Sequence, residues 1–305
     1  MPTNHDIQDN LSNWDDRANI HAGGGYGDIA GFINNPNGVT GTVKRDLEVL
    51  LPHLPANSVK GQRLLHLQSH IGTDTLSWWR LGAVHVHGID FSPNSLHYAR
   101  DIAKQAGADI TYVQSDARYA AKALANEAQG FDVIVTSAGT ITWLPDLQDW
   151  ANSIAALLAP GGIFMIRDNH PLLFALDNDG LTITQNYFSG AEISYDSDGS
   201  YTAGSKGLIQ HTRNHNWAHD FQEITSVLLK AGLTIEALGE QRITDWQALP
   251  MLTFNQEEDG WQMPADLPQI PLTFSLVARK QTNMSDEPRL DGILVRHFSF
   301  LIKWC

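Results

Sequence analysis

Cysteine is almost absent from this chain of 305 residues, since the single one, Cys305, is the last residue. One thiol excludes an intrachain disulfide, a cysteine-rich zinc site and a catalytic thiol in the core, and it favours a reducing cytoplasm. The sequence also lacks a run of about 20 apolar residues, which a membrane-spanning helix needs. Its first residues lack the basic-then-apolar pattern of a secretion signal. We therefore expect a cytoplasmic protein without a membrane partner.

Positive charge is also scarce, because 20 Lys and Arg residues face 34 Asp and Glu residues. The formal net charge of −14 would repel a phosphate backbone, so no nucleic-acid partner is expected. Apolar residues make up 42% and charged residues 18%, which is typical of a globular chain and not of a disordered one. The length suits one large domain or two small ones.

From residue 62 onward, short apolar runs alternate with segments of helical periodicity. Strands are predicted at 63–67, 84–90, 109–114, 131–136 and 163–167. Helices are predicted at 73–81, 93–105, 117–128 and 146–159. Strands of about 5 residues that alternate with helices of about 10–15 residues predict parallel βαβ units. The fold class is therefore α/β, with a Rossmann-like, doubly wound, mostly parallel sheet whose ligands bind at the carboxyl ends of the strands.

The flanking segments have a different character. Residues 1–45 are polar and glycine-rich, and we expect an N-terminal lid segment with one or two helical turns at 13–20. Residues 46–280 form the main domain, and a short helix predicted at 42–51 lies across its start. The remaining 281–305 form a C-terminal tail without an assigned role.

The second half of the main domain carries an insertion. Two turn clusters with aromatic and β-branched residues between them predict an antiparallel cap at 171–217. A helix follows from Asp220 to about residue 232, because Asp220 and Glu223 have the spacing of a capping box. Strands at 233–238 and 273–278 complete the sheet.

Three strand ends carry the residues that could bind a ligand or take part in catalysis. These are Gln68, Ser69, His70 and Gly72 after the first strand, Asp90, Phe91 and Ser92 after the second, and Asp116 and Ala117 after the third. The carboxylate of Asp90 suits a ribose diol, because it can accept from both hydroxyls at once. Asp116 suits an adenine amino group, and Phe91 suits the adenine face. Alternatively, Asp90 only caps the helix that follows, together with Ser92.

In this order, the strand ends resemble those of the class I S-adenosylmethionine-dependent methyltransferases over residues 62–170, and more weakly to about 280. The first strand of that family ends in a hydrophobic-acidic-hydrophobic-Gly-x-Gly-x-Gly pattern, whereas this chain has His66 for the acid and Gln68 and His70 for the first two glycines. The stretch 65–76 resembles a bacterial branch with a Leu-Gln-x-His-x-Gly loop. Residues 131–139 resemble the fourth strand and active-site loop, which includes Ser137, and 158–162 resemble the turn before the fifth strand.

The resemblance implies a methyltransferase that uses S-adenosylmethionine as its cofactor and methylates a small-molecule acceptor. It assigns the ribose to Asp90 and the adenine to Asp116, with the other strand-end residues and Ser137 beside them. The N-terminal segment then has a role, with Arg17 paired to the methionine carboxylate and Tyr26 close to the sulfonium. The alternative for this segment is a surface arm.

Histidine is plentiful, with 13 residues. His170 ends the fifth strand and His219 precedes the last helix, so either is a candidate catalytic base or orienting group, against an ordinary capping role. His211, His215 and His219 are spaced four apart, but the segment is extended and we predict no metal site. His85 and His87 alternate with Val84 and Val86 and are expected to be structural. The predicted substrate pocket is lined by Trp143, Trp217 and Tyr187, for which simple packing is the alternative.

Two other functions remain open at this stage. One is a nicotinamide-dependent oxidoreductase on a similar sheet, against which the glycine-poor first loop argues, because a pyrophosphate needs close backbone approach. The other is a non-catalytic S-adenosylmethionine- or nucleoside-binding module. Both a monomer and a homodimer are compatible with the sequence.

Overall fold

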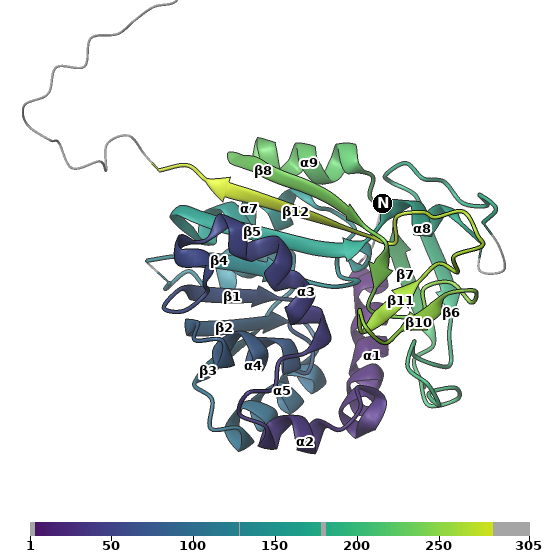
Figure 1. The fold of residues 1–305 in the computed structure, drawn as a ribbon, viewed down its shortest axis with the longest axis horizontal. Coiled ribbons are helices and arrows are strands. Elements are labelled where there is room, and N and C mark those ends of the chain that lie inside the picture. The colour runs from purple at the N-terminus through teal and green to yellow at the C-terminus, as the bar shows by residue number, and fades with distance from the viewer. Residues whose placement is uncertain (1–3, 128, 178–180, 283–305) are drawn as a thin grey trace, which may run out of the picture.

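A seven-stranded sheet forms the centre of the computed structural model, which describes residues 4–127, 129–177 and 181–282 (Figure 1). Its order is β3-β2-β1-β4-β5-β12-β8. The strands are β1 (Arg63–Leu67), β2 (Val84–Asp90), β3 (Ile110–Gln114), β4 (Phe131–Thr136), β5 (Leu158–Asn169), β8 (Leu233–Gln241) and β12 (Thr273–Lys280). Strands β1 to β5 pair in parallel, and β12 is antiparallel to both β5 and β8. The predicted Rossmann-like, mostly parallel sheet is confirmed.

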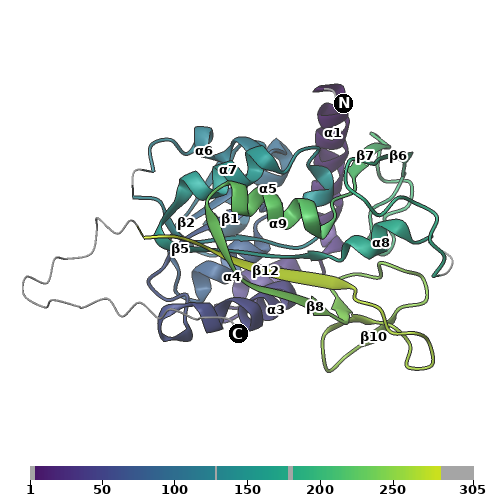
Figure 2. The same ribbon diagram turned by 90° about the horizontal axis from the view of Figure 1, so that it is seen from above.

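Helices cover both faces of this sheet (Figure 2). One face carries α3 (Gly41–Leu50), α4 (Thr73–Arg80) and α5 (Pro93–Gln105), and the other carries α6 (Ala120–Ala123), α7 (Gln148–Leu157) and α9 (Phe221–Lys230). On the first face, Trp78 of α4 is fully buried with Val86 and Val133. On the second, Trp150 of α7 meets Phe164 of β5 edge-on at 5.3 Å. Burial of these apolar surfaces drives the layered fold.

The helix predicted at 117–128 is mostly wrong. A 3₁₀ turn at Ala117–Tyr119 is followed by the four residues of α6. The cause is Ser153 of α7, whose Oγ donates to the carbonyl of Arg118 at 2.6 Å and accepts from the amide of Ala121 at 3.3 Å. A side chain from a distant helix thus bonds to backbone groups that a continuous helix pairs internally.

The N-terminal segment is more helical than predicted. Helix α1 spans Asn4–Ile20, not one or two turns, and α2 spans Ile29–Asn34. Helix α1 runs beside the cap and α5 (Figure 1). Its buried residues are largely polar, among them Asn10 and Asn13, so hydrophobic periodicity gave little sign of its length.

The predicted cap at 171–217 contains an antiparallel strand pair, β6 (Glu192–Asp196) and β7 (Arg213–Trp217), beside the short helix α8 (Pro171–Ala175). An isolated antiparallel bridge joins Leu176 and Ile183. A second small sheet of β9 (Ile243–Thr244), β10 (Thr253–Asn255) and β11 (Gly260–Gln262) was not predicted. Residues 178–180 of the first turn cluster and 283–305 of the predicted tail lie outside the described residues. In the described part of the chain, no helix has both the length and the apolar content needed to span a lipid bilayer.

Candidate active site

A cavity of about 1210 Å³ lies at the carboxyl ends of the parallel strands, with walls from α1, the segment after it and the cap. This is the place where open α/β sheets bind ligands. The predicted cofactor residues that line it are Arg17, Tyr26, Gln68, Ser69, His70, Asp90, Phe91, Asp116, Ala117 and Ser137. Gly72 and Ser92 do not line the cavity and are the N-cap residues of α4 and α5. The structure therefore brings residues from three strand ends and the N-terminal segment to one site.

The loop after β1 holds two side chains where the related pattern has glycines. Gln68 and His70 have φ angles of +55° and +47°, the left-handed region that favours glycine. Gln68 donates from Nε2 to the carbonyl of Thr140 at 2.9 Å, and its Oε1 is buried without a partner among the described residues. The one remaining glycine, Gly72, is required, because a Cβ there would lie 2.4 Å from Oη of Tyr112.

His70 is part of a chain of hydrogen bonds that joins three segments. Its Nδ1 lies 2.8 Å from Oγ of Ser95 and its Nε2 lies 2.7 Å from Nδ1 of His21. The Nε2 of His21 in turn lies 2.6 Å from Oγ of Ser200 in the cap. Burial lowers the pKa of His70 to about 3 and that of His21 to about 2, so both rings are neutral at physiological pH. The β1 loop, the N-terminal segment and the cap are thus connected by neutral groups.

Asp90 stands at the end of β2 with both carboxylate oxygens directed by the backbone. Oδ2 accepts from the amide of His70 and Oδ1 from the amide of Ser92, each at 2.9 Å. The helix cap is Ser92, whose Oγ accepts from the amide of Ser95, so the alternative that Asp90 is only the cap is wrong. Burial raises the pKa of Asp90 to about 6. Each oxygen keeps a lone pair for a further donor such as a hydroxyl.

Asp116 lines the cavity, but its carboxylate already has a charged partner that the sequence did not predict. Its carboxylate forms an ion pair with Arg118, with Nη2 at 2.6 Å from Oδ2 and Nε at 3.1 Å from both oxygens. It also accepts from the amide of Arg118, which starts the 3₁₀ turn. An adenine amino group at this position would share the carboxylate with a guanidinium.

Arg17 is buried in the cavity wall between two tryptophans. Its guanidinium carbon lies 5.4 Å from the ring centre of Trp14 and 5.7 Å from that of Trp143. Its nitrogens donate to Asn13 Oδ1 at 2.6 Å and Ser200 Oγ at 3.3 Å, both neutral. Among the residues that the structure describes, no carboxylate lies within ion-pair distance of Arg17. A buried cation with only neutral partners fits an anionic ligand group.

The sequence reasoning missed Asp74, an acid in the first turn of α4 that also lines the cavity. Its Oδ1 accepts from Oγ1 of Thr40 at 2.5 Å, and no cationic side chain pairs with it in the described ranges. Burial, with the nearby Asp46 and Asp245, raises the pKa of Asp74 to about 7. The sequence signal that could have identified Asp74 is its position just after the strand-to-helix loop. In the described ranges, Arg17 and Asp74 thus bring a cation and an acid to the cavity, neither of which has an ion-pair partner.

The loop after β4 is held in place by an acid from β5. Asp168 accepts from the amides of Gly139, Thr140 and Ile141 at 2.6–3.0 Å. Ser137 donates to Oδ2 of the buried Asp46 at 2.5 Å. The loop that would face the reacting groups is thus fixed by charge-assisted hydrogen bonds.

The predicted catalytic histidines do not line this cavity. His170 caps α8, where its Nδ1 accepts from the amide of Leu172 at 3.1 Å, and its Nε2 bonds to Glu240 at 2.9 Å. His219 has both ring nitrogens bonded, to Glu223 and to the carbonyl of Leu144, each at 2.8 Å. Both residues have the capping or structural role that was the alternative.

Of the three aromatic residues predicted to line the substrate pocket, one lines the cavity and two do not. Trp143 lines the cavity, meets Trp14 edge-on at 5.2 Å and donates to the carbonyl of Gly139. Trp217 is buried beside His215, and Tyr187 meets Phe188 edge-on, so neither lines the cavity. Tyr201 of the cap was not predicted, and its hydroxyl bonds to that of Tyr26.

Comparison with known proteins identifies a domain family and a shared fold. Residues 65–162 match the methyltransferase domain family. No curated protein matches the chain significantly. The fold is similar to that of an S-adenosylmethionine-dependent methyltransferase from Mesorhizobium loti, with a TM-score of 0.53 and 22% identity over 76% of this chain and 96% of that one. It is also similar to a putative S-adenosylmethionine-dependent methyltransferase from Listeria monocytogenes, with a TM-score of 0.51 and 17% identity over 77% and 96% of the two chains.

The match identifies a methyltransferase domain at residues 65–162. The chain as a whole shares the fold of S-adenosylmethionine-dependent methyltransferases. This result speaks against the nicotinamide-dependent oxidoreductase. The assignment to the branch with a Leu-Gln-x-His-x-Gly loop stays a prediction.

Proposed function

We propose that the chain methylates a small molecule held beside the cofactor in the cavity at the strand ends. The observation that carries this proposal is the size and position of the cavity. Its volume of about 1210 Å³ exceeds the roughly 300–1,000 Å³ of most single-ligand pockets, which leaves room for a second molecule. The acidic chain disfavours a polyanionic acceptor. The proposal also places the protein in the reducing cytoplasm, as a monomer or a homodimer.

The cavity residues fit the cofactor by their chemistry. Asp90 would accept from the ribose hydroxyls, and Phe91 and Asp116 would contact the adenine. Arg17 and Asp74, which have no ion-pair partners among the described residues, would hold the carboxylate and the ammonium of the methionine end. Each charged side chain would then face a ligand group of opposite charge.

The same walls suit methyl transfer. The bound cofactor supplies a methyl group on a positively charged sulfonium. Trp14, Tyr26 and Trp143 present aromatic rings to the cavity, which exclude water and favour a nearby cation. The loop fixed by Asp168 would position the acceptor, because such a transfer depends chiefly on alignment.

The ribose assignment is tested by Asp90→Ala. Each hydrogen bond to a charged group is worth about 1.5–3 kcal/mol, so loss of the carboxylate should weaken S-adenosylmethionine binding by well over tenfold. Isothermal titration calorimetry measures this directly. The matched control is Asp109→Ala, an exposed carboxylate just before β3 at the opposite end of the sheet, which should bind as the wild type does. Unchanged affinity in Asp90→Ala would refute the assignment.

Turnover needs its own assay, because binding alone also fits a non-catalytic module. A panel of small amines, alcohols, thiols and carboxylates can be screened for release of S-adenosylhomocysteine. Release with a small molecule supports the proposal. Release only with a protein or nucleic acid would contradict the proposed acceptor class.

A further inference from the structure

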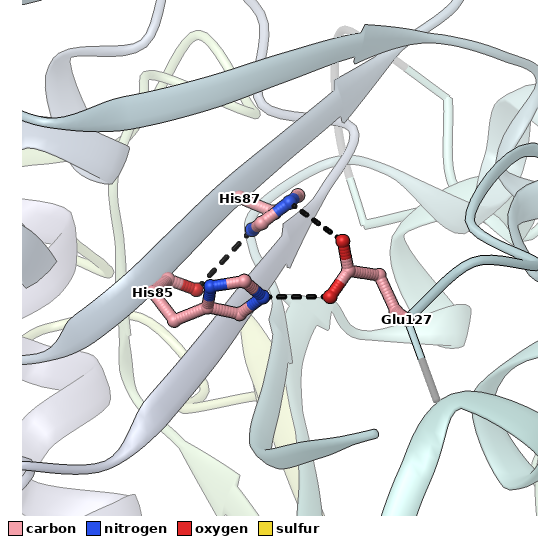
Figure 3. Close-up of side chains that lie close together, drawn as sticks. All are labelled: His85, His87 and Glu127. Carbon is pink, nitrogen blue, oxygen red and sulfur yellow. Dashed lines mark hydrogen bonds and ion pairs between the residues drawn. The ribbon is translucent and has the colours of Figure 1, made fainter. Parts of the chain in front are cut away.

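Three side chains that could ligate a metal meet far from the cavity. His85 and His87 lie at the start of β2, and Glu127 lies in the turn before β4 (Figure 3). We call them the histidine–glutamate cluster. Their ligating atoms all lie within 4.8 Å of one another. Asp90 and the cavity lie at the other end of β2, so the cluster is separate from the methyltransferase site.

The hydrogen bonds of His87 orient a lone pair toward the carboxylate. Its Nδ1 lies 3.2 Å from the carbonyl oxygen of His85, and a carbonyl can only accept, so Nδ1 carries the proton. In the neutral ring, Nε2 then presents a lone pair to Oε1 of Glu127 at 3.4 Å. Two acceptors that face each other require a proton or a metal cation between them. A ring N–H donated to a backbone carbonyl is also the usual support of a metal-bound histidine.

The second histidine completes the arrangement. Nε2 of His85 lies 2.6 Å from the other carboxylate oxygen of Glu127, and the two imidazole centres are 4.5 Å apart. Figure 3 shows both rings directed at the carboxylate. His85 is partly exposed whereas His87 is buried, which leaves one side of the cluster open to water.

The backbone around the cluster is unusual. His85 has a φ of +48°, and the pairing of β1 with β2 shifts between Arg63 and Leu65, so β2 bulges at this point. Glu127 is fixed by hydrogen bonds from its amide to Leu124 and from Gly130 to its carbonyl. Left-handed conformations of bulky residues concentrate at functional sites.

We propose that His85, His87 and Glu127 bind one divalent transition-metal ion of the Zn²⁺ type. The ligands would be the two Nε2 atoms and one carboxylate oxygen, with water as the fourth. Metal–ligand bonds of about 2.0–2.2 Å in a tetrahedron set ligand atoms about 3.4 Å apart. The distance between His87 Nε2 and Glu127 Oε1 already has this value. The distance between His85 Nε2 and Glu127 is shorter, and rotation of the exposed His85 ring would lengthen it. Two imidazoles and a carboxylate suit Zn²⁺, Co²⁺ or Ni²⁺ more than Mg²⁺ or Ca²⁺.

One cation lies near the cluster, since Arg63 of β1 is 6.0 Å from the ring centre of Phe131, which contacts both histidines. The second candidate group, Asp6, Glu192 and His215, has both ring nitrogens of its one histidine bonded to acids and a serine, and it clasps α1 to the cap.

The test is metal titration of the full chain. Zn²⁺ is titrated into EDTA-treated protein by calorimetry, and Co²⁺ by visible absorption. The wild type should bind one equivalent that is lost, or weakened at least tenfold, in His85→Asn and in Glu127→Gln. Asn tolerates the left-handed backbone at position 85, so this variant removes the ring with little strain.

The matched control is His53→Gln. His53 also bonds to a carboxylate, that of Glu236 at 3.0 Å, but has no second histidine, so this variant should keep the full stoichiometry. The melting temperature with and without Zn²⁺ gives an independent readout. If the wild type and both cluster variants bind the same number of ions with the same affinity, or if none of them binds, the cluster is a hydrogen-bonded clasp and the proposal is overturned. Methyltransferase activity is not the readout, so failure here leaves the proposed function standing.

Discussion

Two acids in the cavity differ in how far the sequence reveals them. Asp90 follows from its place at the end of a predicted strand, about 20 residues past the first strand-to-helix turn. Asp74 does not, because its environment depends on Thr40, the N-cap of α3, which lies 34 residues earlier in the chain. Local patterns locate a side chain on an element, whereas its environment depends on distant parts of the chain.

The raised pKa of Asp74 makes stability depend on pH. Because its pKa is about 7 in the folded protein and about 3.9 when unfolded, the folded state binds the extra proton between these values. The stabilising contribution of this proton is full below pH 4 and is lost as the pH rises through 7. Asp74→Asn should therefore gain melting temperature relative to the wild type between pH 5 and 8, by about 2–4 °C for each kcal/mol.

Thermal unfolding at several pH values checks this expectation in the absence of ligand. The comparison isolates Asp74 because Asp90, whose pKa is also raised, is present in both proteins. Asp109→Asn serves as the exposed control. Parallel pH profiles for the wild type and Asp74→Asn would show that the carboxyl is not desolvated as described.

At the scale of elements, α1 is attached to the cap by polar side chains. Asn10 donates from Nδ2 to the carbonyl of His215 and accepts at Oδ1 from its amide, at 2.8 and 2.9 Å. Asn13 donates to the carbonyl of His211 at 2.7 Å. A buried amide side chain thus acts as an extra strand partner for β7. The sequence predicted a closing segment but not this means of attachment.

Asn10→Ala should loosen α1 from the cap. It leaves two buried backbone groups of His215 without a partner, at a cost of about 1–3 kcal/mol each. We expect faster hydrogen exchange in α1 and β7 and weaker S-adenosylmethionine binding, because Arg17 lies on the same helix. Gln8→Ala, an exposed change on α1, should leave both unchanged. Equal exchange in both variants would contradict this role of Asn10.

The elements also show where prediction from sequence ends. The strands at 63–67, 84–90 and 131–136 were correct to the residue, because apolar runs between turn signals are local features. The helix at 117–128 and the length of α1 were not, because bonds to Ser153 and to the cap decide them. The roles of His170 and His219 depend on distant contacts for the same reason. Without the fold, a histidine that caps a helix or bonds to a neighbouring acid looks the same as a catalytic one.

At the scale of the whole molecule, ligand binding should raise the melting temperature. A ligand at 100 times its Kd stabilises the folded state by about 2.7 kcal/mol. For a chain of this size, S-adenosylmethionine and S-adenosylhomocysteine should then raise the melting temperature by roughly 5–10 °C. NADH is the control and should give no shift. A shift with NADH and none with either nucleoside would contradict the assigned cofactor.

The overall architecture was the most predictable level. Repeated alternation of short strands and helices, joined by right-handed crossovers, restricts the chain to few topologies. The small sheet of β9, β10 and β11 escaped prediction because its strands have only two or three residues. Such short segments carry too little pattern to distinguish them from loops.

Strand β2 has a consequence for how this protein tolerates change. Its seven residues carry the cluster at one tip and Asp90 at the other. Side chains alternate along a strand, so removal of a single codon inside β2 would point every following side chain to the opposite face. Such a deletion would displace both ends at once. Insertions and fusions are better placed in the exposed loops of the cap, and β2 is best left intact in any redesign.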